Sequence, residues 1–183
     1  NVAMGENALA NNTTAAQNTG LGQNSLLTNT TGASNVAVGH DALRLNTTAS
    51  NNIAVGVDAL RANTTGTINV AVGSLALDAN QTGSASTVVG YRAGSAFTAD
   101  GLTAFGKDAL ELCTTGINTA VGANALAAVT TSGSNTAMGS DALTVNTAAN
   151  NTAFGHYSLL ANTTGADNTA VGESTLAGTT TGN

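Results

Sequence analysis

Residues 52–66 read NIAVGVDALRANTTG, and related copies of this unit follow one another along the whole 183-residue chain. The unit recurs every 16 to 17 residues. A repeat of this length is too short for a helical hairpin or a propeller blade, and it is close to the length of one turn of a β-solenoid. The repeat therefore predicts an all-β rod made of stacked turns, which we call coils.

We number the positions of each coil as slots, starting from the residue that opens the unit, which is usually Asn. Eleven coils then begin at residues 1, 18, 35, 52, 69, 86, 102, 118, 135, 151 and 168. Stacked in parallel β register at a rise of about 4.8 Å each, they predict a parallel β-solenoid about 50 Å long. Because the repeat is already present at the first residue and continues to the last, residues 1–183 are expected to be one repetitive segment of a longer fibre, with no caps visible.

Slot 5 is glycine in all eleven coils. A position that never carries a Cβ predicts positive φ or close backbone contact, and hence a corner of the coil. Glycine also recurs near slot 15, which predicts a second corner. The predicted corner residues at slot 5 are Gly5, Gly22, Gly39, Gly56, Gly73, Gly90, Gly106, Gly122, Gly139, Gly155 and Gly172.

The apolar slots predict two short strands. Slot 2 is Val, Ile or Thr and slot 4 is always apolar, so both are expected on one face of a strand that points into the coil. Slot 9 is Leu in ten coils and slot 11 tends to be small or apolar, which predicts a second strand facing the first. The expected interior is then a thin seam of slots 2, 4 and 9.

Asparagine recurs at slots 1 and 12. Identical amides in stacked coils lie one rung apart, so they are expected to hydrogen-bond along the rod as a ladder. We favour this structural interpretation over a ligand-binding one. The slot 12 ladder is predicted to contain Asn12, Asn29, Asn46, Asn63, Asn80, Asn146 and Asn162.

Slot 3 is alanine in nine coils. Because it lies between slots 2 and 4, it is expected to point out of the coil, as an apolar stripe that a monomer would rarely leave bare. The simplest account is a covering by identical stripes of other copies, most simply in a parallel homotrimer. The predicted inter-chain stripe is Ala3, Ala37, Ala54, Ala71, Ala104, Ala120, Ala137, Ala153 and Ala170.

The segments at residues 35–39 (NVAVG) and 168–172 (NTAVG) resemble the core motif of YadA-like trimeric autotransporter adhesin heads, the Hep/Hag repeats. The unit at residues 52–66 is similar to repeats of bacterial surface fibres and of some phage tail fibres. The resemblance covers the whole chain. It implies a left-handed parallel β-roll, three chains about one axis, and an extracellular adhesive or spacer role. The period is longer than is typical of adhesin heads, and the surplus lies around Asn-Thr-Thr-Gly.

Composition excludes several partners. The chain has 4 Lys plus Arg against 10 Asp plus Glu, a net charge of −6, so it lacks the clustered cations that nucleic acid or an anionic membrane would require. No apolar run is long enough to span a bilayer, and we expect no membrane insertion by this segment. The single cysteine, Cys113, has no partner for an internal disulfide and is expected to be a buried small hydrophobe.

No constellation predicts catalysis, a metal site or a cofactor. His40 and His156 both occupy slot 6 but lie seven coils apart, so they cannot share a metal. The carboxylates of Asp41 and Asp58 stack at slot 7, but the calcium-binding G-G-x-G-x-D signature is absent. Exposed ion pairs such as Arg44 with Asp58 are the preferred interpretation. The chain is therefore predicted not to be an enzyme.

Residues 86–101 form the most irregular coil, in which Gly94 replaces the slot 9 leucine and Phe97 replaces the ladder asparagine. Tyr91 and Arg92 lie on its turn. In a chain with only 3% aromatic residues, the set Tyr91, Arg92 and Phe97 is the best candidate recognition patch. The competing interpretation, which we favour, is a bulge packed by Phe97.

Two further surface features have alternative interpretations. Sequons such as the one at Asn46 could carry glycans in a secretory pathway, although Asn-Thr-Thr also makes a good polar turn. Stacked threonine pairs such as Thr47 and Thr48 could order water as an ice-binding surface. We favour the structural interpretation in both cases.

These observations predict a structural, non-enzymatic segment of an extracellular fibre or adhesin, on a cell surface or a virion. It would space or display a binding tip, with weak adhesion along its length to a host or surface receptor or a glycan. One alternative is a phage tail-fibre shaft of the same architecture. The other is an ice-binding solenoid. The expected partner in every fibre interpretation is another copy of the chain.

Overall fold

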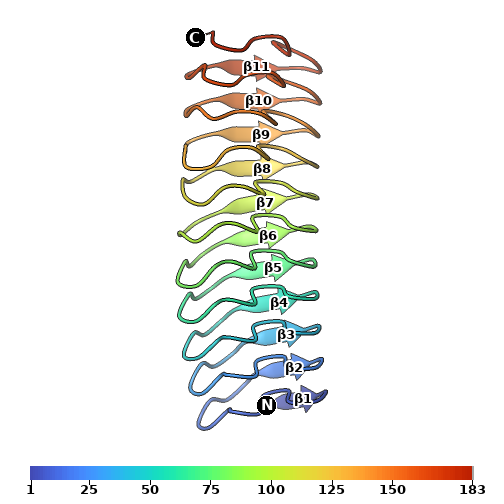
Figure 1. Cartoon of the computed structure of the whole chain (residues 1–183), viewed down its shortest axis with the longest axis vertical. Helices are drawn as coiled ribbons and strands as arrows, with labels where there is room; N and C mark the ends of the chain where they lie inside the picture. Colours follow the sequence, from blue (N-terminus) through green and yellow to red (C-terminus); the bar gives the residue numbers. More distant parts are fainter. Residues whose placement is uncertain (183) are drawn as a thin grey trace.

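A computed structural model describes residues 1–182 as a straight rod of stacked coils (Figure 1). Each coil contributes one three-residue strand, and the described residues contain no helix. The parallel β-solenoid predicted from the repeat is confirmed. The strands are β1 (Val2–Met4), β2 (Thr19–Leu21), β3 (Val36–Val38), β4 (Ile53–Val55), β5 (Val70–Val72), β6 (Thr87–Val89), β7 (Thr103–Phe105), β8 (Thr119–Val121), β9 (Thr136–Met138), β10 (Thr152–Phe154) and β11 (Thr169–Val171).

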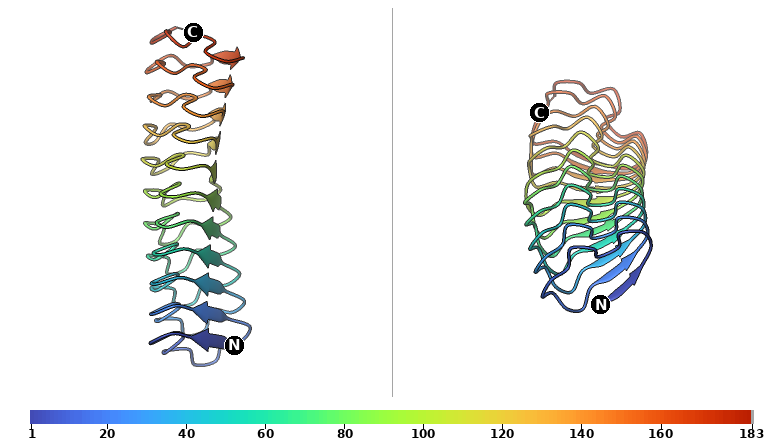
Figure 2. Two further views of the ribbon diagram at one scale, coloured as in Figure 1. Left: turned by 90° about the vertical axis from the view of Figure 1, so that its right-hand side faces the viewer. Right: turned by 60° about the horizontal axis from the view of Figure 1, so that its bottom comes forward.

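All eleven strands form one parallel sheet in sequence order, from β1 to β11. The register aligns identical slots, so that Ala54 of β4 pairs with Ala71 of β5 and Val55 pairs with Val72. One side of the rod is therefore a narrow sheet that runs its whole length (Figure 2). Every slot forms a column parallel to the rod axis, and this repetition turns single residues into continuous surfaces.

The slot 5 glycines form the predicted corner directly after each strand. In all eleven coils this glycine has φ between +121° and +141°, a region that other residues rarely adopt. Neighbouring corners are also in close contact. A Cβ built on Gly73 would lie 2.4 Å from the carbonyl oxygen of Gly90 in the next coil.

A series of turns follows the corner, and the second strand predicted at slots 9 and 11 is absent from residues 1–182. In the fourth coil, Ala59 N donates to Gly56 O (3.3 Å) and Arg61 N donates to Asp58 O (3.3 Å). The residues at slots 7 and 9 have positive φ, +58° at Asp58 and +50° at Leu60. Leucine is strained in this region by about 1–2 kcal/mol. The conformation persists because it aims Leu60 into the interior, where the side chain is fully buried.

The strand side chains face the opposite way from the prediction. Slot 3 points inward: the alanines of β3 to β10 at this slot are 0% exposed, and Ala170 is 1% exposed. Slots 2 and 4 point outward, as the exposed Ile53 and Phe105 illustrate. The predicted inter-chain stripe is therefore wrong as a surface, and its correct position is the wall of the core. The residues that line this wall are Ala37, Ala54, Ala71, Ala104, Ala120, Ala137, Ala153 and Ala170, while Ala3 belongs to the first coil and is exposed at the end of the rod.

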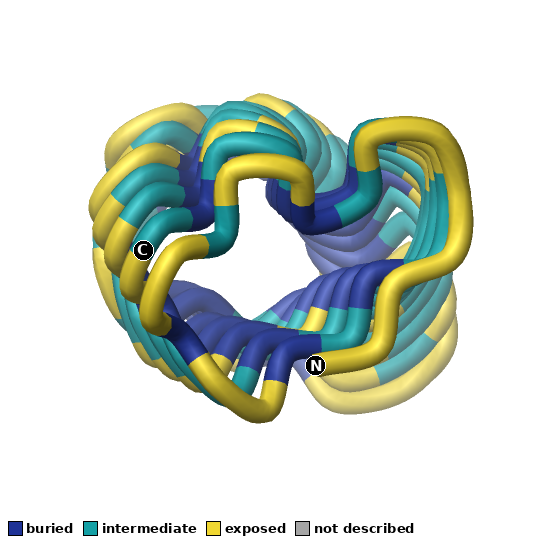
Figure 3. The backbone as a smooth tube through the Cα atoms, turned by 90° about the horizontal axis from the view of Figure 1, so that it is seen from below, coloured by how far each residue is buried: buried dark blue, intermediate teal, exposed yellow. Residues whose placement is uncertain are grey.

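The interior is too narrow for larger side chains at slot 3. Seen along the axis, the coils superpose around one thin core, and buried positions recur at the same places in each coil (Figure 3). Leucines at slot 9 reach across from the turns and fill the space against the alanines at slots 3 and 8. Small residues on the sheet side therefore complement large residues on the turn side.

The irregular sixth coil is an alternative packing of the same core. A Cβ on Gly94 would lie 2.6 Å from Cδ2 of Leu102, so Leu102 occupies space beside the missing slot 9 side chain. Phe97, which replaces a ladder asparagine, is 0% exposed. Phe97 cannot belong to a surface recognition patch, and the expectation that Phe97 packs inside this coil is confirmed.

Candidate functional site

The asparagines at slot 12 form the predicted ladder inside the rod. Asn46 Nδ2 donates to Asn29 Oδ1 (2.8 Å) and to the carbonyl oxygen of Ala49 (3.0 Å). Asn63 Nδ2 in turn donates to Asn46 Oδ1 (2.9 Å). These amides are fully buried, and each bond would be costly to leave unmade in a dry interior. The side-chain bonds between neighbouring coils join Asn12, Asn29, Asn46, Asn63 and Asn80, and, separately, Asn146 and Asn162.

The asparagines at slot 1 bond differently, through the backbone. Asn35 Oδ1 accepts from the backbone N of Asn52 in the next coil (3.0 Å), while Asn35 Nδ2 donates to Ala49 O (2.8 Å). Both bonds tie the Asn35 side chain to the backbone around the start of the next coil. Both asparagine columns are structural, and neither is available to a ligand.

The burial of these amides argues against N-linked glycans on the slot 12 asparagines. An N-linked glycan attaches to Nδ2, which in Asn29, Asn46 and Asn63 is buried and donates two hydrogen bonds. The threonines that follow are engaged as well, because Thr47 Oγ1 donates to the carbonyl oxygen of Thr64 (3.1 Å). The Asn-Thr-Thr segment is therefore a turn in which the slot 13 hydroxyl donates a hydrogen bond to the neighbouring coil.

The outward face of the sheet is the most extended surface of the rod. Slot 2 provides Val, Ile or Thr and slot 4 provides Met, Leu, Val or Phe in every coil, so neither column contains a charge. We call these two columns the sheet face. Its most exposed members are Val2, Met4, Ile53, Phe105, Met138, Phe154 and Val171.

By the spacing of parallel strands, the sheet face is about 50 Å long and roughly 10 Å wide. Slot 4 is apolar in every coil, whereas slot 2 is Val or Ile in four coils and Thr in seven. The outward side chains of the strand, expected at slot 3 from the sequence, therefore lie at slots 2 and 4.

Residues 1–182 enclose no pocket, and no helix among them could cross a membrane. The functional candidates are therefore the columns themselves. No protein-family model matches the chain, and neither a curated protein nor a solved structure matches it. The resemblance to trimeric autotransporter heads thus stays a prediction.

Nearly all charged side chains lie at slots 6, 7 and 10, along the edge of the rod that follows the corner glycines. We call this edge the charged edge. Two of its ion pairs form within a coil: Arg44 Nη1 is 3.2 Å from Asp41 Oδ2, and Arg61 Nε is 3.5 Å from Asp58 Oδ1. The predicted pairing of Arg44 with Asp58 across coils is replaced by these pairs three residues apart.

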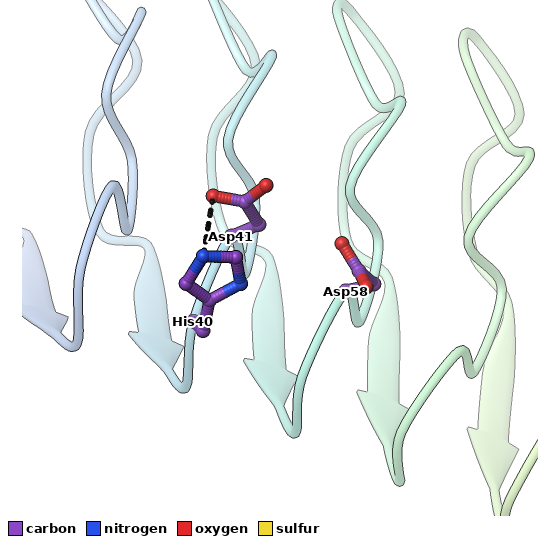
Figure 4. Close-up of side chains that lie close together, drawn as sticks. All are labelled: His40, Asp41 and Asp58. Carbon is purple, nitrogen blue, oxygen red and sulfur yellow. Dashed lines mark ion pairs between the residues drawn. The ribbon is translucent and has the colours of Figure 1, made fainter.

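One group on the charged edge combines different ligand types. His40, Asp41 and Asp58 each offer one nitrogen or oxygen atom, and these atoms all lie within 4.8 Å of one another (Figure 4). The sequence analysis compared His40 with the distant His156 and so missed this group. Two features of the sequence would have revealed it: His40 and Asp41 are adjacent in one coil, and Asp41 and Asp58 occupy slot 7 of neighbouring coils.

The candidate recognition patch retains two of its three members. Tyr91 is 46% exposed, and the guanidinium carbon of Arg92 lies 6.0 Å from the centre of its ring. Arg92 is also paired with Asp108 and Glu111, so its charge is compensated within the rod. With Phe97 buried, the remaining pair does not form a distinct recognition surface.

Cys113 lies in the core, where it interrupts the slot 12 ladder, and it is fully buried, as predicted. Burial raises the pKa of the Cys113 thiol from 9.0 to about 11. Because the folded pKa is above the unfolded one, this stabilising contribution is complete below pH 9 and is lost as the pH rises toward 11.

We therefore expect the free energy of unfolding to fall more steeply between pH 9 and pH 11 in the wild type than in Cys113→Val. Valine is a suitable replacement because Val129 occupies the same slot in the next coil. Urea unfolding of both proteins across this pH range measures the difference. Parallel pH profiles would contradict the assignment of the buried thiol.

Proposed function

We propose that this chain is a structural, non-enzymatic segment of an extracellular fibre or adhesin, in which copies associate through the sheet face. The segment spaces or displays a binding tip that belongs to the same fibre. The observation that carries the proposal is the uncharged column pair at slots 2 and 4, which continues through all eleven strands, with slot 4 apolar in each of them.

The stacking of identical slots supports a fibre role in physical terms. Each coil is hydrogen-bonded to the next through the strands and through asparagine side chains. The spacing between coils is therefore fixed along the whole rod. A surface that repeats every coil binds best to another surface with the same repeat. Another copy of the chain, aligned in parallel, provides that match in every coil. Three copies about one axis are the arrangement that the resemblance to trimeric autotransporter heads implies.

A phage tail-fibre shaft would use the same geometry in a virion. The ice-binding alternative has less support. The slot 13 hydroxyls donate to backbone carbonyls of the neighbouring coil, as at Thr30 and Thr47. The sheet face has a rank of six threonines at slot 2 from Thr87 to Thr169, but Phe105 and Phe154 project beside it at slot 4 and break its flatness.

The variant Val38→Glu/Val55→Glu tests the proposal, because it puts two charges on the sheet face in neighbouring coils. Uncompensated charges buried in an interface cost several kcal/mol, so we expect association to weaken by at least about 100-fold. The oligomeric state and its concentration dependence are measured by sedimentation, and circular dichroism checks that the rod remains folded.

The matched control is Thr48→Glu/Thr65→Glu, which adds the same charges in the same two coils at exposed slot 14 positions away from the sheet. It should associate like the wild type. A wild type that sediments as a monomer, or a sheet-face variant that assembles normally, would overturn the proposal. Glutamate at Ala54 is not a suitable test, because Ala54 lies in the core and its replacement would disrupt the fold.

A further inference from the structure

Asp58 is an exception among the acidic residues at slot 7 of the charged edge. Each of the other three has a donor or cation from slot 7 of the preceding coil. Asn24 Nδ2 donates to Asp41 Oδ1 (2.9 Å), and Asn124 Nδ2 donates in the same way to Asp141 (2.9 Å). Arg92 is the corresponding partner of Asp108.

Asp58 instead follows Asp41 in this column, and Leu75 follows Asp58. Two carboxylates at the same slot of neighbouring coils repel each other. Asp58 therefore receives no amide or guanidinium from slot 7 of the preceding coil, and its cation is Arg61 of its own coil.

His40 brings a third ligand to the same place. It occupies slot 6, directly before Asp41, and its Nε2 lies 3.7 Å from Asp41 Oδ1 (Figure 4). An imidazole and two carboxylates form a donor set that suits zinc and related divalent ions, whereas calcium prefers oxygen ligands alone. Three protein ligands leave further positions for water, consistent with a His40 side chain that is 49% exposed.

The backbone holds these residues in place across the two coils. Asp58 N donates to His40 O (3.0 Å), and Asp41 N donates to Gln23 O (3.0 Å). Zinc requires bonds of about 2.0–2.2 Å, so the three donor atoms, now within 4.8 Å, must approach further. His40 and Asp58 are partly exposed and can rotate inward, while the more buried Asp41 is fixed by Asn24.

We propose that His40, Asp41 and Asp58 bind one divalent transition-metal ion, with zinc as the representative ion, between the third and fourth coils. Arg44 and Arg61 approach the same carboxylates and compete with the metal for them. The site is therefore expected to be weaker than a structural zinc site and to be strengthened when a competing guanidinium is removed.

Zinc titration of metal-free protein by calorimetry tests the proposal. We expect one saturable site per chain in the wild type. His40→Ala and Asp58→Asn should each weaken zinc binding by at least about 10-fold, a loss typical of damage to a metal site. Arg44→Gln should tighten it. Cobalt, used as a spectroscopic substitute, should give absorption bands that His40→Ala removes.

The matched control is His156→Ala. His156 occupies the same slot six, but its acidic neighbour is the exposed Glu173 alone, at 3.7 Å. This variant should bind zinc like the wild type. The absence of saturable zinc binding, or equal losses in His40→Ala and His156→Ala, would overturn the assignment. Neither result would bear on association through the sheet face, which is a separate column of the rod.

Discussion

Replacing Gly73 by alanine is expected to destabilise the rod by about 3 kcal/mol or more, the combined effect of backbone strain and a steric clash. Gly73 has φ of +135°, and the added Cβ would lie 2.4 Å from the oxygen and 2.6 Å from the carbonyl carbon of Gly90. Backbone atoms cannot move aside as a flexible side chain can. The two coils would have to separate at the corner, and the strand pairing between β5 and β6 would weaken with them.

Alanine substitutions at two other glycines separate the backbone strain from the steric clash. Gly101 has φ of +80° and no atom within 4 Å of a built Cβ, so Gly101→Ala reports strain alone, about 1–2 kcal/mol. Gly178 has neither a positive φ nor a neighbour within 4 Å, so Gly178→Ala should be nearly neutral. Urea unfolding followed by circular dichroism measures the series. Equal stabilities of the Gly73 and Gly178 variants would contradict the close packing of the corners.

The second large effect is expected for Asn46→Val, at about 2–4 kcal/mol, because three hydrogen-bonding partners each lose a bond to the Asn46 side chain. Asn29 Oδ1 and the carbonyl oxygen of Ala49 both accept from Asn46 Nδ2, and Asn63 Nδ2 donates to Asn46 Oδ1. Valine fits the slot sterically, as Val129 demonstrates, so the loss is polar rather than steric.

The control is Asn11→Val, which makes the same chemical change at an exposed slot 11 position. It should alter the free energy of unfolding by less than about 0.5 kcal/mol, as surface substitutions usually do. Hydrogen exchange adds spatial detail, because Asn46→Val should deprotect the amides of the third and fourth coils first. Uniform loss of protection along the rod would indicate that the ladder does not act locally.

Slot-by-slot composition predicted the solenoid, its strands, its corners and the slot 12 ladder, but it gave the wrong orientation of the strand. In the pattern Val-Ala-Val all three positions are apolar, so the alternation of a strand does not say which face is buried. Side-chain size indicates which face of the strand is buried. Slot 3 changes only among Ala, Gly and Val because the narrow interior limits it, whereas slot 4 accepts Phe105 and Met138 because it is open to solvent.

The turns were mistaken for a strand for a different reason. Leu60 and Ala62 alternate as in a strand, and leucine is an unlikely residue for positive φ, so local preferences argued against the observed conformation. Burial of Leu60 against the alanine wall overrides that preference. The metal-binding group was missed because its three members are brought together by the stacking of coils, which aligns Asp41 with Asp58 seventeen residues apart in sequence.

The strands lie across the rod, and their hydrogen bonds therefore point along its axis (Figure 2). A pulling force applied to the two ends loads these bonds in opening rather than in shear, so the coils should detach one after another. Each detached coil of 16 to 17 residues extends from a rise of about 4.8 Å to about 55 Å. Under mechanical load the rod would lengthen in regular steps, one coil at a time. The force at each step would be limited to the force that detaches one coil.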